Sequence, residues 1–142
     1  MFKECIWQTK VNSEQETSEL IRNRLYTLKV PYCLYLEGDV GTGKTYVCKQ
    51  ISKFFNVDNV TSSSFLYYNI YNSHVRIIHV DYYNSLDTEE FFYTNVYEEI
   101  NNHTVVLHEW SSSYFLLDIP QYVLNLKIVE VLKREFTFFR LT

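Results

Sequence analysis

The three glycines of this chain, Gly38, Gly41 and Gly43, all lie in one short window of a 142-residue sequence that contains no alanine. Glycine lets a backbone adopt left-handed conformations and approach a ligand closely. A chain that keeps glycine at a single place therefore indicates a loop whose backbone wraps around something. Elsewhere the sequence is rich in rings, with thirteen Tyr and ten Phe, so aromatic packing can supply a core.

Composition limits the class of protein. The length predicts a single domain over residues 1–142, and 46% hydrophobic with 21% charged residues is typical of a soluble globular chain. The formal net charge is −4, and no basic stripe is present, which argues against a stand-alone nucleic-acid binder. An acidic balance still allows a nucleic acid that is held by partner subunits.

No apolar run reaches the roughly 20 residues that span a bilayer. The first residues include Lys3 and Glu4 and no apolar stretch, so we expect no secretory signal and no membrane association. The cysteines, Cys5, Cys33 and Cys48, form no C-x-x-C pair. We expect them to be reduced, mostly buried thiols of a cytoplasmic protein.

Apolar periodicity and turn residues predict alternating strands and helices. Strands are expected over 3–9, 32–36, 65–71, 75–82, 104–107, 124–128 and 136–141. Ser13 with Glu16, and Asp87 with Glu90, are capping-box pairs that predict helices, the first ending at Pro31. A hairpin is expected to join 65–71 to 75–82, and 124–128 is expected to be half-exposed. These elements predict an α/β domain with a mixed sheet, parallel at its centre and antiparallel at its edges.

The glycine window matches the phosphate-binding pattern G-x-x-x-x-G-K-[ST]. It reads Gly38-Asp39-Val40-Gly41-Thr42-Gly43-Lys44-Thr45. In such a loop the backbone N–H groups surround a polyphosphate, the lysine reaches the β and γ phosphates, and the hydroxyl ligates Mg²⁺. The helix expected from Lys44 adds its positive N-terminal dipole. The other interpretation is a glycine-rich turn with an incidental lysine, but the buried strand before the loop and the helix after it favour a P-loop NTPase-like, three-layer fold.

Two acidic residues close predicted strands: Asp81 follows 76–80 and Glu109 follows 104–108. Ligands of open α/β sheets bind at the carboxyl ends of the strands. Asp81 is therefore the candidate for the metal, and Glu109 for orienting water or acting as general base. Either could instead be a solvated loop residue. His79 would share a face with Asp81 and is read as structural, whereas Trp110 could cover a nucleotide but is expected by default in the core.

The order of these segments resembles the bacterial TsaE (YjeE) family, the ATPase of tRNA threonylcarbamoyladenosine biosynthesis. Its pattern reads roughly G-D-L-G-A-G-K-T-T, S-P-T-F, H-x-D-x-Y-R and E-W. The corresponding segments here are 38–46, Ser62-Ser63-Ser64-Phe65, His79-Val80-Asp81-Tyr82-Tyr83-Asn84 and Glu109-Trp110. The chain departs from the pattern at Tyr46, Ser63, Ser64 and Asn84.

The resemblance implies a small ATPase that hydrolyses ATP slowly alone, with Mg²⁺ as cofactor. It would act on a complex of the TsaD and TsaB proteins, which would hold most of the tRNA. The residues implied to bind nucleotide are 38–45, Tyr46 and Trp110, and those implied for the metal are Thr45, Asp81, Glu109 and the hydroxyl of Ser64. The implied catalytic residues are Lys44, Asp81 and Glu109.

Two other functions share this loop. A small-molecule or nucleotide kinase would use the same phosphate site, but the five arginines, Arg22, Arg24, Arg76, Arg134 and Arg140, show no cluster typical of a kinase lid. A nucleotide-binding scaffold without turnover is the third hypothesis, because the segment around Ser63 departs from the family pattern.

Overall fold

The structure is a computed structural model that describes residues 1–58, 68–83, 85 and 87–142. In the described residues seven strands form one sheet in the order β1-β7-β6-β2-β5-β4-β3. The strands are β1 (Lys3–Val11), β2 (Tyr32–Glu37), β3 (Tyr68–Asn72), β4 (Arg76–Asp81), β5 (Thr104–Glu109), β6 (Gln121–Ile128) and β7 (Arg134–Leu141).

The centre of the sheet is parallel. β2 lies between β6 and β5, and β4 continues the parallel set beyond β5. The outer strands β1, β7 and β3 pair antiparallel with their neighbours. Every residue of β5 and all of β2 except Glu37 are buried, as expected for strands covered on both faces. The predicted mixed sheet is confirmed.

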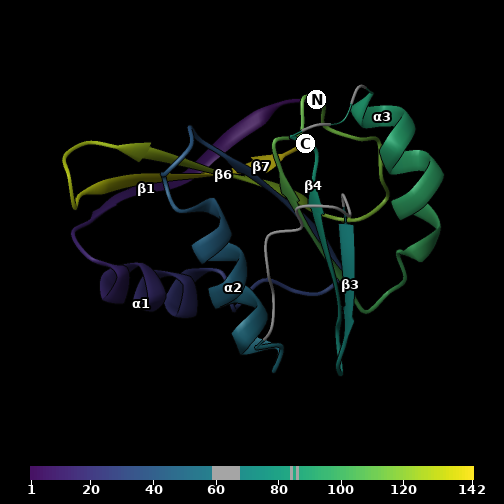
Figure 1. The fold of residues 1–142 in the computed structure, drawn as a ribbon, viewed down its shortest axis with the longest axis horizontal. Helices are drawn as coiled ribbons and strands as arrows, with labels where there is room; N and C mark the ends of the chain where they lie inside the picture. Colours follow the sequence, from purple (N-terminus) through teal and green to yellow (C-terminus); the bar gives the residue numbers. More distant parts are fainter. Residues whose placement is uncertain (59–67, 84, 86) are drawn as a thin grey trace.

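Helices cover both faces, which gives three layers (Figure 1). The helices α1 (Glu14–Arg24) and α2 (Lys44–Phe54) pack on one face, where Ile21, Val47 and Ile51 join a core cluster with the strands. On the other face α3 (Thr88–Phe91) continues into the π-helical turn η1 (Phe92–Val96) and the 3₁₀ turn η2 (Tyr97–Glu99). Phe92 and Val96 belong to a second cluster on that face.

Both predicted capping residues are confirmed. The Ser13 hydroxyl accepts a bond from the Glu16 N–H at 3.1 Å, and the Asp87 carboxylate accepts one from the Glu90 N–H at 3.0 Å. None of the helices in the described residues is long and apolar enough to cross a bilayer.

Three local predictions need correction. Helix α1 ends at Arg24, well before Pro31, because the Leu25 and Tyr26 N–H groups both bond the Ile21 carbonyl and close the last turn there. β6 begins at Gln121, before the predicted start at 124, while the predicted alternation is confirmed over 124–127, where Leu124 and Leu126 are buried and Lys127 is exposed. Ile128, expected on its inner face, is 44% exposed at the strand's end. The hairpin of β3 and β4 is confirmed, while residues 65–67 of the first predicted strand lie outside the described residues.

Candidate functional site

The glycine window is the turn that joins β2 to α2. All three glycines have positive φ, at 150°, 83° and 105° for Gly38, Gly41 and Gly43, a region that other residues rarely adopt. A Cβ at Gly38 would lie 2.5 Å from the carbonyl oxygen of Leu126 in β6. The loop therefore follows a path against the neighbouring strand that a side chain would block, and α2 begins at Lys44 as predicted.

Lys44 is 5% exposed and lies over its own loop. Its ammonium donates to the carbonyl oxygens of Gly38 and Asp39, the second at 3.1 Å, and sits 3.9 Å from the centre of the Trp110 ring. Burial lowers the pKa of Lys44, while the negative charges of Glu109, Asp39 and Asp81 oppose that shift. The ammonium is thus held at the loop by two backbone carbonyls and an indole ring.

Thr45 and Glu109 are brought together from the start of α2 and the end of β5. The Thr45 hydroxyl donates to Oε1 of Glu109 at 3.2 Å, and Glu109 is 3% exposed. A hydroxyl and a carboxylate in this position are hard oxygen donors of the kind that Mg²⁺ prefers. The contact joins two of the residues predicted to serve the metal and the water.

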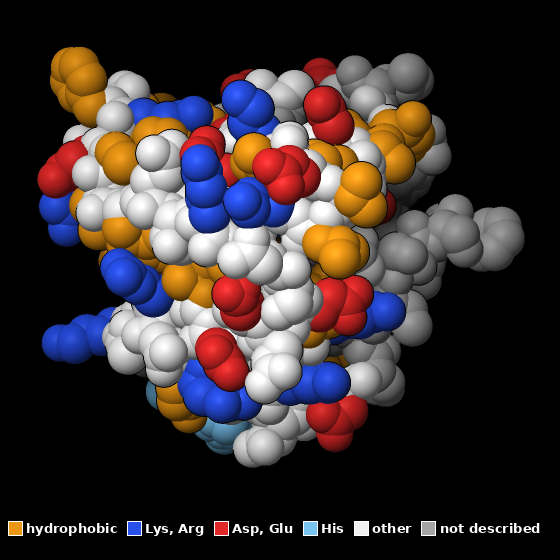
Figure 2. Space-filling view, turned by 90° about the vertical axis from the view of Figure 1, so that its left-hand side faces the viewer, with side chains coloured by type: hydrophobic (Ala, Val, Ile, Leu, Met, Phe, Trp, Pro, Cys, Tyr) orange, Lys and Arg blue, Asp and Glu red, His pale blue; other side chains and the backbone are white. Residues whose placement is uncertain are grey.

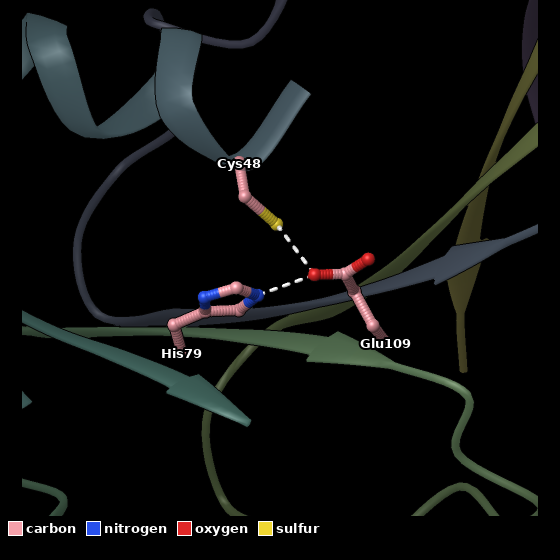
Figure 3. Close-up of side chains that lie close together, drawn as sticks. All are labelled: Cys48, His79 and Glu109. Carbon is pink, nitrogen blue, oxygen red and sulfur yellow. Dashed lines mark hydrogen bonds and ion pairs between the residues drawn. The ribbon is translucent and has the colours of Figure 1, made fainter. Parts of the chain in front are cut away.

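The second carboxylate oxygen of Glu109 faces two further side chains (Figure 3). Nε2 of His79, in β4, forms a hydrogen bond with Oε2 of Glu109, and Sγ of Cys48, on α2, lies 3.9 Å from the same oxygen. His79 is 2% exposed and Cys48 is fully buried. Burial, the charge of Glu109 and the hydrogen bond to it raise the pKa of Cys48, so its thiol is protonated in this arrangement.

Asp81 ends β4 in register with Glu109, so both acids lie at the carboxyl edge of the sheet as predicted. The Asp81 carboxylate accepts a bond from the Tyr83 N–H at 2.9 Å. Burial raises its pKa; this hydrogen bond opposes the shift and the charge of Glu109 adds to it. In the described part of the chain Asp81 forms no hydrogen bond with Thr45.

Trp110 packs against the core, as expected by default, and its role as a cover for a nucleotide stays a prediction. Its backbone has φ 61°, its ring packs at the margin of the second core cluster, and the Lys44 ammonium sits over the same ring. Tyr83 contacts the ring edge-on, with centroids 5.1 Å apart. Trp110 is therefore a partly buried cover over the lysine of the loop.

The sequence is similar to one known protein family over most of its length. The family model described as threonylcarbamoyl adenosine biosynthesis protein TsaE matches residues 11–136. The chain belongs to the TsaE family. The match spans the loop, both strand-end acids and the strands β2 to β6, but only the last residue of β1 and the first three of β7.

Individual TsaE relatives align over most of their own length. The tRNA threonylcarbamoyladenosine biosynthesis protein TsaE of Rickettsia bellii is 34% identical over 131 residues, which cover 89% of this chain and 90% of that protein. Its namesake from Aquifex aeolicus is 27% identical, covering 96% and 98%. The crystal structure of Bacillus subtilis YdiB shares the fold, with a TM-score of 0.68 at 23% identity over 100% of this chain and 89% of that one.

Beside the TsaE loop lies a cavity of about 220 Å³ that sequence reasoning did not predict. Its lining comes from β1, α1, the loop, α2 and the β6–β7 hairpin, and includes Glu14, Thr42, Tyr46, Leu132 and Arg134. The Tyr46 hydroxyl donates to the Glu14 carbonyl at 3.1 Å. The hairpin side of the molecule carries interspersed charges of both signs (Figure 2), and Val131 and Leu132 are exposed there.

Arg134 is a site residue that sequence reasoning missed. Its guanidinium donates to the carbonyl oxygens of Thr42 at 3.3 Å and Gly41 at 3.4 Å, so it holds the loop from the base of β7. The arginines form no kinase-like cluster in the sequence, and no sequence signal links residue 134 to residue 41. The involvement of His79 and Cys48 with Glu109 was missed for the same reason.

Some predicted positions remain untested. Ser64, with the rest of the segment 62–65, and Asn84 lie outside the described residues. Val40 is described but is 75% exposed at the tip of the loop.

Proposed function

We propose that this chain is a Mg²⁺-dependent ATPase that supports the formation of threonylcarbamoyladenosine in tRNA. The observation that carries the proposal is the Thr45–Glu109 contact beside a loop of left-handed glycines. It sets a metal-ligating hydroxyl next to a buried carboxylate, at the helix N-terminus where a phosphate chain would bind. Membership of the TsaE family supports the modification pathway.

The loop residues 38–45 supply the phosphate site in this proposal. Backbone N–H groups and the dipole of α2 bind the phosphate oxygens, and Lys44 leaves the Gly38 and Asp39 carbonyls to pair with the β and γ phosphates. Arg134 keeps the loop backbone in place meanwhile. The exchange is favourable because phosphate oxygens carry full charge and the carbonyl oxygens do not.

Mg²⁺ suits the oxygen donors present at this site. Thr45 would hold it directly, with Asp81 and Glu109 at the adjoining strand ends. When bound, the ion neutralises charge that develops on the phosphates. Ser64 keeps the role that the family pattern implies for it, as a further hydroxyl at the metal.

Glu109 orients the water that attacks the γ-phosphorus. The water oxygen forms the new bond to phosphorus, the bond to the bridging oxygen breaks, ADP leaves, and the water proton passes to the carboxylate or to phosphate oxygen. The Thr45 and His79 contacts fix the Glu109 side chain, so it needs no reorganisation before the reaction.

The nucleoside would occupy the cavity beside the loop. Tyr46 and the hydrophobic residue Leu132 offer apolar surface to a base there, next to the Thr42 end of the phosphate site. Trp110 shields the phosphate end from water through its cover of Lys44. The substrate that fits this combination is a nucleoside triphosphate, and we assign ATP.

We further propose that turnover resets a complex of TsaB and TsaD in the cytoplasm. The acidic net charge of −4 supports a division of labour in which those partners hold most of the tRNA. Hydrolysis by this chain alone would be slow and would rise when the partners bind.

The test is phosphate release from ATP and Mg²⁺, with and without the TsaB–TsaD pair. We expect slow release alone and stimulation by the pair. Lys44→Ala should abolish tight ATP binding in calorimetry. Transfer of the phosphate to a small acceptor would support a kinase instead, and tight binding without release under any condition would support a scaffold.

A further inference from the structure

Cys48, His79 and Glu109 bring three different metal-binding atoms to one buried point. The thiol sulfur, the imidazole Nε2 and a carboxylate oxygen all lie within 4.8 Å of one another. They come from α2, β4 and β5, so three separate elements converge on this point (Figure 3). None of the three residues is more than 3% exposed.

Hydrolysis of ATP accounts for only part of this cluster. Glu109 has a role in orienting water, and His79 holds its carboxylate. The thiol of Cys48 has no such role, since Mg²⁺ prefers oxygen and the thiol is a poor hydrogen-bond donor. Cys48 packs in the core, but a sulfur aimed at the oxygen that the imidazole also contacts has no role in hydrolysis.

The donor set matches a thiophilic cation. Cysteine sulfur, histidine nitrogen and a carboxylate oxygen are the ligands of tetrahedral zinc sites, where neighbouring donor atoms stand about 3.5 Å apart. The three atoms here need only small side-chain adjustments to reach that spacing. When the ion binds, the Cys48 thiol releases its proton to solvent. The resulting thiolate and the Glu109 carboxylate neutralise the divalent ion, which removes the main cost of burying its charge.

We propose that Cys48, His79 and Glu109 form a Zn²⁺ site that competes with the hydrolytic use of Glu109. The ion would take the carboxylate oxygen that His79 now contacts and would leave a fourth position for a water. The consequence for turnover rests on the proposed function, because Zn²⁺ can inhibit hydrolysis only if Glu109 orients the water. Binding of the ion itself does not rest on it.

The direct test uses Co²⁺ as a spectroscopic probe without nucleotide. A Cys5→Ser/Cys33→Ser background leaves Cys48 as the sole cysteine of the chain. We expect one equivalent of Co²⁺ to give a thiolate-to-metal charge-transfer band with tetrahedral d–d absorption, and Zn²⁺ to displace it. Cys48→Ser and, separately, His79→Gln should weaken Zn²⁺ binding by more than about tenfold.

Folding of each variant is checked by circular dichroism, and Cys48→Ala serves as a second variant should Cys48→Ser unfold. Absence of the band in the double-serine background would overturn the proposal. So would Zn²⁺ affinity that is unchanged when Cys48 is replaced.

The inhibitory consequence is tested separately. Zn²⁺ is added to the Mg²⁺-ATP reaction, and each rate is divided by the same variant's zinc-free rate. We expect strong inhibition of the wild type and at least tenfold weaker inhibition of Cys48→Ser. Equal inhibition of both would contradict competition at this site. A cobalt band without any ATPase activity would leave the metal site standing and defeat the proposed function alone.

Discussion

At the scale of single residues, Glu109 makes the most contacts with other side chains of the candidate site. One carboxylate accepts from Thr45, contacts His79 and lies near Cys48. Glu109→Gln keeps the side-chain shape and removes the negative charge. We expect nucleotide binding to persist and hydrolysis to fall by at least about 100-fold, because the amide cannot accept the water proton. The rate of hydrolysis is measured as single-turnover phosphate release, with the exposed Glu89→Gln as control. A wild-type rate in Glu109→Gln would show that Glu109 does not act on the water.

The loop glycines provide a matched pair of substitutions. Gly38→Ala should destabilise the fold by about 2 kcal/mol or more, since the new Cβ would sit 2.5 Å from the Leu126 carbonyl oxygen and φ is positive. Gly41→Ala also has positive φ but meets nothing within 4 Å, so about 1 kcal/mol is expected. Chemical denaturation compares the two; equal losses would mean that the contact with β6 does not matter.

Site residues that belong to a local sequence pattern could be predicted. Site residues that come together only through packing between distant segments could not. The Gly-Lys-Thr run can be recognised from the sequence because all residues of the phosphate-binding pattern lie in one short loop with fixed spacing. The meeting of Cys48, His79 and Glu109 depends on how α2 lies over the sheet and on the register of β4 with β5. No pattern within any one segment predicts where α2 lies over the sheet or how β4 is aligned with β5.

At the scale of elements, the residues that mark where a helix begins were more informative than those that mark where it ends. The side chains of Ser13 and Asp87 bond the first turns as their spacing predicts. Pro31 did not set the end of α1, because a proline restricts the residue just before it and says nothing about a helix that has already ended. Similarly, the spacing of Phe92 and Val96 predicts a helical face but not the π-helical turn that carries them.

The N-cap of α3 can be tested directly. Asp87→Ala removes the acceptor of the Glu90 N–H and should lower the free energy of unfolding by about 1 kcal/mol. Asp87→Asn keeps an acceptor and should lose only a few tenths. Urea denaturation of both variants gives the comparison; equal losses would assign the effect to the charge rather than to the cap.

At the scale of the whole molecule, strand order was the hardest feature to predict. Buried and alternating strands indicated a parallel centre with antiparallel edges, but not that β1 pairs with β7 at the far end of the chain. Lys3 lies opposite Leu141, so this edge of the sheet joins the two ends of the sequence. Such pairings depend on long-range packing that local periodicity does not encode.

A buried histidine beside the second core cluster predicts that the free energy of unfolding depends on pH. His108 is fully buried there between stacked rings, with Tyr35 and Tyr82 at centroid distances of 4.4 and 5.7 Å. Its Nδ1 shares a hydrogen bond with the Tyr82 hydroxyl, and within the described residues its Nε2 has no partner. Burial and the charge of His79 lower the pKa of His108 to about 3. The folded protein therefore holds a neutral imidazole where the unfolded chain, with its usual pKa of about 6.5, binds a proton.

The difference between the folded and the unfolded pKa of His108 decides whether stability rises or falls with pH. Between the two pKa values the unfolded state binds more protons, so stability falls as pH falls below about 6.5. The contribution of His108 should make the free energy of unfolding about 2 kcal/mol lower at pH 5 than at pH 7. The raised pKa of Asp81 acts in the opposite direction, because its carboxyl takes up a proton more readily in the folded state. Urea denaturation at the two pH values measures the loss, and His108→Asn, whose Oδ1 can replace Nδ1 as the acceptor for Tyr82, should remove most of it. A loss of the same size in that variant would place the responsible group elsewhere.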